Sequence, residues 1–181
     1  RLLQEDRDHA QKQLDSVNEK ILEMEQAHYT LEVKLLDEIS GIGQLTAQQI
    51  IAEIGTDMDK FETADQLTSW AGLAPGNNES AGKKKSTSTK KGNKYLRTAM
   101  VTAAWAAARG KKTYWFFLFS YLKRRMSAKK AIIAIARRML KVVFKVLKDK
   151  IQYVEGGKEL FDHYQHLRLA KQVDKSTLIA A

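Results

Sequence analysis

The sequence predicts an all-α protein with a long N-terminal coiled-coil arm, a helix-hairpin-helix and a compact helical domain that carries a long basic loop. Apolar residues recur with a heptad period over 3–35 and with helical spacing again in the second half of the chain. One Pro and ten Gly in 181 residues leave room for long helices and argue against an all-β fold. We place the arm at 1–35, the main domain at 36–154 and a polar tail at 155–181.

The arm is predicted from a heptad pattern that no Gly or Pro interrupts within residues 1–40. Position d reads Leu3, Ala10, Val17, Met24 and Leu31, and position a reads Arg7, Leu14, Ile21, His28 and Leu35. This seam predicts a coiled coil or a long helical hairpin arm, and the coiled coil would build a homo-oligomer, a dimer or higher. The alternative is one long helix that packs on its own domain. Because the chain opens in mid-heptad at Arg1, we expect a further domain before it.

Residues 36–55 have the pattern of a helix-hairpin-helix, in which Gly41-Ile42-Gly43 forms the turn. The glycines permit a tight turn with positive φ, and Ile42 is expected to fill the core between the two helices. Backbone N–H groups at the start of the second helix, together with the helix dipole, can hold a DNA phosphate. We therefore take Gly41, Ile42 and Gly43 as candidate DNA contacts. The acidic charge around them leaves open a hairpin that only packs.

The following elements are predicted from caps and breakers. Thr63 caps a short helix over 64–73, in which Trp70 is expected to lie in the core rather than to stack on a base. A loop of Gly, Ser, Thr, Asn and Lys then covers 74–93, and loops of this length in compact domains are usually functional or disordered. Three helices follow, from Asn93 to Gly110, over 112–125 and, capped by Ser127, over 128–150.

The charge is unevenly distributed along the chain. Residues 81–150 hold 21 Lys and Arg and one acidic residue, whereas residues 1–80 are acidic. So one-sided a block favours a nucleic-acid partner, DNA first, over a solvated basic face. Candidate phosphate contacts lie in the loop, at the start of the next helix and on a basic stripe of the last long helix: Lys83, Lys84, Lys85, Lys90, Lys91, Asn93, Lys94, Arg97, Arg137, Lys141 and Lys145. Lys130 and Lys148 belong to the same stripe.

Several classes of protein are excluded. No run of 18 apolar residues exists, so a membrane partner is not expected, and the absence of Cys rules out disulfides and thiolate metal sites. The sequence has no Walker loop and no zinc motif, and His163 and His166 lack a third ligand nearby. We therefore expect no metal site and no cofactor in this chain.

The one feature that indicates catalytic activity is a serine in the Lys- and Gly-rich loop. Basic groups beside a hydroxyl can stabilise charge on an attacked phosphate, and a serine can act as a covalent nucleophile. From these residues alone, a loop that only grips phosphate is the favoured alternative.

Taken together, motifs from residue 35 to residue 154 resemble the C-terminal domain of a family of bacterial insertion-sequence transposases. The motifs are Ile39-Ser40-Gly41-Ile42-Gly43, Trp70-Ala71-Gly72-Leu73-Ala74-Pro75, Ser80-Ala81-Gly82-Lys83, Lys90-Lys91-Gly92-Asn93-Lys94-Tyr95-Leu96-Arg97, and Tyr121-Leu122-Lys123-Arg124 with 131–140 and Tyr153. In that family a RuvC-like DEDD domain is paired with a serine-bearing domain, and some members are guided by a bridge RNA.

The resemblance implies a bacterial, cytoplasmic DNA recombinase in which a coiled coil builds oligomers and the DEDD domain binds magnesium. It implies that Ser80 attacks the DNA backbone and forms a phosphoserine link, with Ser86 and Ser88 as competitors for this role. Ala81 replaces the Gly that is commoner in the family. No DEDD domain lies in these residues, so we expect this chain to be inactive alone. The alternative is a non-catalytic helix-hairpin-helix module that binds DNA or RNA and oligomerises through the coiled coil.

Overall fold

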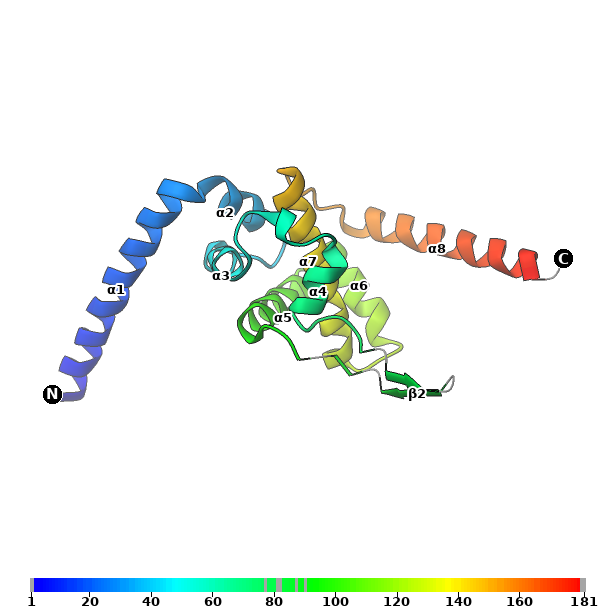
Figure 1. Cartoon of the computed structure of the whole chain (residues 1–181), viewed down its shortest axis with the longest axis horizontal. Helices are drawn as coiled ribbons and strands as arrows, with labels where there is room; N and C mark the ends of the chain where they lie inside the picture. Colours follow the sequence, from blue (N-terminus) through cyan, green and yellow to red (C-terminus); the bar gives the residue numbers. More distant parts are fainter. Residues whose placement is uncertain (1, 77, 81–82, 87, 90, 180–181) are drawn as a thin grey trace.

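A computed structural model confirms the all-α class. It describes residues 2–76, 78–80, 83–86, 88–89 and 91–179, and among these only the backbone of 2–3, 25–27, 78–80, 83–86 and 169–179. Helix α1 (Leu2–His28) and helix α8 (Gly157–Ile179) extend from opposite sides of a helical body (Figure 1). Within the described ranges, no helix has both the length and the apolar character that a membrane crossing requires.

The heptad does not continue as one helix, because α1 ends at His28 and α2 (Thr30–Asp37) begins after a break at Tyr29. Tyr29 has φ −133° and ψ 12°, which is not helical. Val33 and Leu36 lie off the heptad seam yet are buried, whereas the seam residue Leu31 is 56% exposed. The chain turns so that this off-seam face meets the core. The alternative of one long helix over the whole arm is therefore wrong, and coiled-coil pairing stays a prediction.

Helices α2 and α3 (Gln44–Ile54) are joined by a tight turn that packs on α5 (Lys94–Arg109). Gly41 has φ +95°, and a Cβ added there would lie 2.5 Å from the Ala103 carbonyl oxygen and 2.6 Å from the Ala107 nitrogen. Only glycine combines this φ with so close an approach. Ile42 is buried beneath the turn, as the sequence predicted.

A short 3-10 helix, η1 (Met58–Lys60), leads into α4 (Ala64–Trp70). The Thr63 hydroxyl accepts a hydrogen bond from the Gln66 N–H, which confirms the predicted cap. The helix ends earlier than expected, before Gly72 with φ +68°. Trp70 is 42% exposed and lies against the Phe61 ring, so its assignment to the core was wrong.

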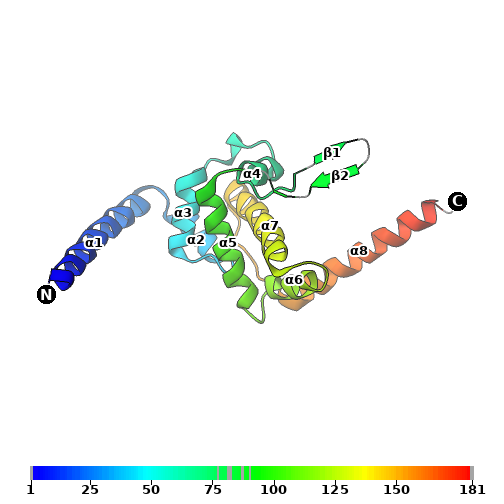
Figure 2. The same ribbon diagram turned by 90° about the horizontal axis from the view of Figure 1, so that it is seen from below.

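The segment predicted as a loop contains an antiparallel hairpin of β1 (Asn78–Ser80) and β2 (Lys83–Ser86). Ser80 pairs with Lys83 and Glu79 pairs with Lys84. The pairing continues towards the body, where Pro75 bridges Thr89 and the Gly76 N–H donates to the Ser88 carbonyl. The hairpin projects from the body beside α4 (Figure 2). The sequence did not predict these strands, because their residues are polar and lack the alternation of apolar and polar side chains that indicates a strand.

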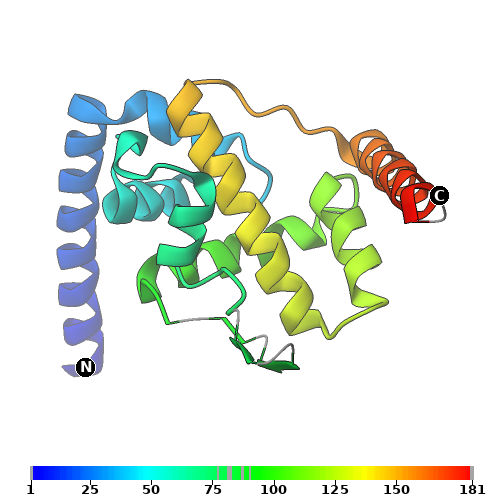
Figure 3. The same ribbon diagram turned by 45° about the vertical axis from the view of Figure 1, so that its right-hand side comes forward.

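Three helices complete the body: α5, α6 (Tyr114–Lys123) and α7 (Ala128–Asp149). The α7 helix crosses the body, and α5 and α6 pack against it (Figure 3). Asn93 caps α5 as predicted, whereas Thr113 caps α6 and delays its start to Tyr114. The Ser127 hydroxyl makes no capping hydrogen bond at the start of α7. The predicted apolar face of α7 is buried: Ile132, Ile135, Met139, Val143 and Val146.

The Glu155 carboxylate joins three parts of the fold. It accepts hydrogen bonds from the Ser40 hydroxyl (2.7 Å) in the α2–α3 turn and from the Tyr114 N–H (2.8 Å) at the start of α6. It also accepts from the Tyr153 hydroxyl (3.1 Å) and from the Gly157 N–H (3.1 Å) at the start of α8. The predicted polar tail thus begins with a residue that is tied into the domain.

Candidate nucleic-acid interface

A groove of about 970 Å³ lies between α7 and the foot of the hairpin. The foot contributes Pro75, Ser88 and Thr89, and α7 contributes the cationic residues. Those cations are Lys129, Lys130, Arg137, Arg138 and Lys141, and the apolar lining is Leu73, Met126, Ile133 and Ala134. A groove with cations along one wall and apolar groups between them suits a phosphate backbone.

The cations reach one side of α7 because of its helical period. Lys130, Arg137, Lys141 and Lys145 follow one another at spacings of seven, four and four residues, opposite the buried face. Lys129 and Lys130 stand in the first turn, where the helix dipole disfavours cations. A bound anion would relieve this repulsion.

Asp65 of α4 neutralises two of the predicted contact residues. Its Oδ1 lies 2.7 Å from the Lys141 Nζ and 2.8 Å from the Arg137 Nη2. Hydrogen bonds from Lys141 and Arg137 hold the pKa of the Asp65 carboxyl below its usual range. The carboxylate is therefore charged at neutral pH and occupies positions that a phosphate oxygen would also favour. The buried Nε of Arg137 has no hydrogen-bond partner in the described part of the chain.

Two other predicted contacts, Arg97 and Asn93, are engaged within the protein, and Arg97 holds the foot of the hairpin in place. The Arg97 guanidinium donates to the Gly72 carbonyl and to the Thr89 hydroxyl (3.0 Å), which ties α5 to the end of α4 and to the groove wall. The Asn93 side chain accepts from the Leu96 N–H (2.8 Å) and donates to the Glu53 carboxylate (2.6 Å). Their polar groups already have protein partners. Lys91, Lys94 and Lys145 are exposed.

The α2–α3 turn does not take part in this groove. None of the groove-lining residues comes from Gly41, Ile42 or Gly43. Gly43 is exposed, but Ser40 beside the turn donates to the Glu155 carboxylate, which places negative charge close to it. A DNA contact of this turn stays a prediction, and its packing on α5 explains the glycine at 41 without one.

The predicted nucleophile lies on the hairpin whose foot forms one wall of the groove. Ser80 is the last residue of β1, and its backbone pairs with Lys83. The side chains of Ser80, Lys83, Lys84 and Lys85, and the whole of Lys90, lie outside the described part of the structure. Lys129 and Arg138 were missed as contacts, although their place beside the basic stripe could have shown them.

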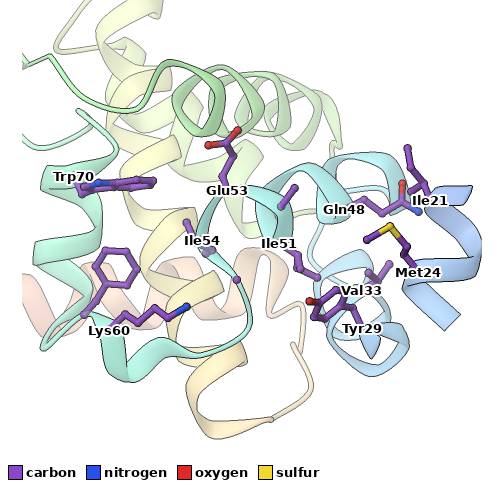
Figure 4. A pocket seen from close by; sticks show the side chains of 13 residues that line it. Ile21, Met24, Tyr29, Val33, Gln48, Ile51, Glu53, Ile54, Lys60 and Trp70 are labelled. Atoms are coloured by element: carbon purple, nitrogen blue, oxygen red, sulfur yellow. The ribbon is translucent and has the colours of Figure 1, made fainter. Parts of the chain in front are cut away.

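A second cavity, of about 690 Å³, has a different character. It lies between α1, α3 and α4, and its lining is largely apolar, with Met24, Ile51 and Trp70 from these three helices (Figure 4). Glu53 and Lys60 are the charged residues that line it. Without a cluster of cations it does not resemble a phosphate site.

The described residues contain no group of three His, Asp or Glu side chains that could hold a metal ion. The magnesium that the resemblance implies therefore finds no fitting ligand set in this part of the chain.

Part of this chain is similar in sequence to known proteins. Residues 33–117 match the model of the transposase IS116/IS110/IS902 family. The chain is similar to the pilin gene-inverting proteins of Moraxella bovis and Moraxella lacunata, each 32% identical over 118 residues. The aligned part is 64% of this chain but only 36% of each relative. The chain thus spans little more than a third of the length of the curated relatives it matches.

Proposed function

We propose that this chain is the DNA-binding, serine-bearing domain of an insertion-sequence transposase that cleaves and transfers DNA strands during transposition. The observation that carries the proposal is the cationic groove at the foot of the hairpin on which Ser80 lies. The family match to residues 33–117 includes both the hairpin and its support on α4 and α5. The name of the Moraxella relatives, pilin gene-inverting protein, is that of proteins that rearrange DNA.

In this proposal α7 holds the strand and the hairpin presents the nucleophile. Cations of the groove neutralise phosphates and fix the position of the backbone, without reading bases. The Ser80 Oγ bonds to phosphorus as the bond from phosphorus to the departing strand breaks. A base accepts the proton of the Ser80 hydroxyl, and the oxygen of the departing strand takes up a proton. The same proposal includes magnesium, which a RuvC-like DEDD domain outside these residues would bind. It also includes a guide RNA, as in those family members that use one.

Binding of DNA by charge tests this proposal directly. We expect the 181-residue chain to bind duplex DNA with little sequence preference, and to lose about 10³–10⁵ in affinity between 50 and 200 mM salt if six to ten phosphates are neutralised. The double variant Lys129→Glu, Lys130→Glu should weaken binding and lower the salt slope by about two. Fluorescence anisotropy with a labelled duplex measures both quantities.

Two matched variants separate the groove from net charge. Lys111→Glu with Lys112→Glu changes the net charge equally, but these exposed residues do not line the groove. This control should bind nearly as the parent does. Asp65→Asn releases Arg137 and Lys141 and should tighten binding several-fold, whereas Asp59→Asn, beside Lys148 at 3.8 Å, should change it less. Binding that does not respond to salt, or that falls equally in both lysine variants, would overturn the assignment of the groove.

Self-association through α1 is a further part of the proposal. Leu14, Val17 and Met24 are each more than half exposed on this helix, so an apolar seam is available to a second copy. Replacing both Ile21 and Met24 by Asp should give a monomer in analytical ultracentrifugation. Leu45→Asp, at an exposed position on α3, is the control and should leave the mass unchanged. If the variant with Asp at positions 21 and 24 keeps the mass of an oligomer, the apolar seam of α1 packs against its own domain instead of a second copy.

A further inference from the structure

A cavity of about 420 Å³ between α6, α7 and α8 has aromatic walls and a cationic rim. Its rings come from Tyr114, Trp115, Tyr121, Tyr153 and Tyr164, and its cations are Arg138 and Arg168. No acidic side chain lines it among the described residues. Flat apolar walls beside positive charge match the two parts of a nucleotide, the base and the phosphate.

The cations and rings of this pocket are held in place by one another. The Arg168 Nη1 donates to the Tyr121 hydroxyl at 3.1 Å, and the Arg125 Nη1 donates to the same oxygen at 3.3 Å. The Tyr121 ring lies edge-on to Phe161, which anchors α8 on α6. The Tyr114 ring is likewise edge-on to the Tyr164 ring, with centroids 6.1 Å apart. Helix α8 thereby forms one wall of the pocket.

Trp115 contributes the most buried ring to the pocket lining. It is 2% exposed, and its Nε1–H interacts with the Tyr153 hydroxyl. Burial raises the pKa of Tyr114 and of Tyr153 above the usual value for a phenol, so both walls stay neutral.

The pocket and the groove share one lining residue, Arg138. Arg138 lines both cavities, because it stands on α7 between the basic stripe and the face towards α6. A strand whose phosphates follow the groove would therefore come to the mouth of the aromatic pocket at Arg138.

We propose that the aromatic pocket binds one unstacked nucleotide of the strand that runs along the groove, with its base among the tyrosine rings and its phosphate between Arg138 and Arg168. This inference rests on the proposed function, since it needs a nucleic acid in the groove. Stacking on aromatic rings accepts any base, so the pocket would hold single-stranded segments without reading their sequence.

The test compares single-stranded and duplex DNA on the 181-residue chain by fluorescence anisotropy. The probe is a ten-residue thymidine oligonucleotide, with a duplex as the second ligand. Tyr164→Ala should weaken binding of the single strand by about five- to 150-fold, the range for loss of one stacked base, and leave duplex binding unchanged. Tyr164→Phe keeps the ring and should bind as the parent does.

Tyr95→Ala is the matched control, because Tyr95 is exposed on α5 and does not line the pocket. Photo-crosslinking of the same oligonucleotide with 5-iododeoxyuridine should label residues between 114 and 168. Equal loss in Tyr95→Ala and Tyr164→Ala, or unchanged single-strand binding in Tyr164→Ala, would overturn the pocket while the groove stands. If neither ligand binds the parent chain, the proposed function itself fails.

Discussion

On the proposed function, replacing Ser80 by Ala should abolish strand transfer and leave DNA binding nearly intact. Loss of a covalent nucleophile lowers turnover by about 10³-fold or more, because no other group can form the intermediate. Binding should persist, since the groove cations on α7 and the hairpin foot do not include Ser80. The measurement is strand transfer on a labelled substrate with magnesium, beside an affinity titration of the same variant.

Ser86 and Ser88 are the matched controls. Ser86 pairs with Asn78 on the opposite strand, and Ser88 lines the groove, so both lie on the same hairpin or its foot. Ser86→Ala and Ser88→Ala should reduce transfer much less than Ser80→Ala. An adduct trapped on the protein and mapped by mass spectrometry should lie on Ser80. An adduct on another serine would reassign the nucleophile, and full activity without Ser80 would favour the non-catalytic binding module.

Replacing Gly41 by Ala should destabilise the domain by about 3 kcal/mol or more, enough to lower the melting temperature by about 6–12 °C. The residue has φ +95°, which a side chain disfavours, and the added methyl would meet the backbone of α5 at 2.5–2.6 Å. Backbone cannot move aside as the end of a flexible side chain can, so α5 or the turn must shift. Thermal unfolding followed by circular dichroism measures the loss.

Gly43→Ala separates this packing role from a role of the turn in DNA binding. A Cβ at Gly43 has no neighbour within 4 Å and φ is −100°, so the cost should stay within about 1 kcal/mol, mainly from a poorer helix cap. The two variants thus compare a tightly packed glycine with an open one in the same turn. Similar melting temperatures for both would contradict the close approach of the turn to α5.

Local signals in the sequence were sufficient for most of the helices. Thr63 and Asn93 cap the helices that they were expected to cap, because a side-chain oxygen three residues before a backbone N–H acts within one turn. The apolar face of α7 and its basic stripe likewise follow from the helical period alone. The hairpin around Ser80 was missed because its strands are short, polar and without apolar alternation.

The partners of the candidate residues depended on segments far apart in the chain. Asp65 precedes Arg137 and Lys141 by more than seventy residues, and Arg97 reaches back to Gly72, so no local pattern could show these pairs. The break at Tyr29 has a similar origin, because it is the core that draws Val33 and Leu36 inwards. The sequence by itself determined the helical class, the Thr63 and Asn93 caps and the side of α7 on which charge gathers, since these depend on neighbours within a few residues. Only the tertiary structure decided which cations face the groove and which are already paired, because packing α4 and the hairpin foot on α7 brings distant charges together.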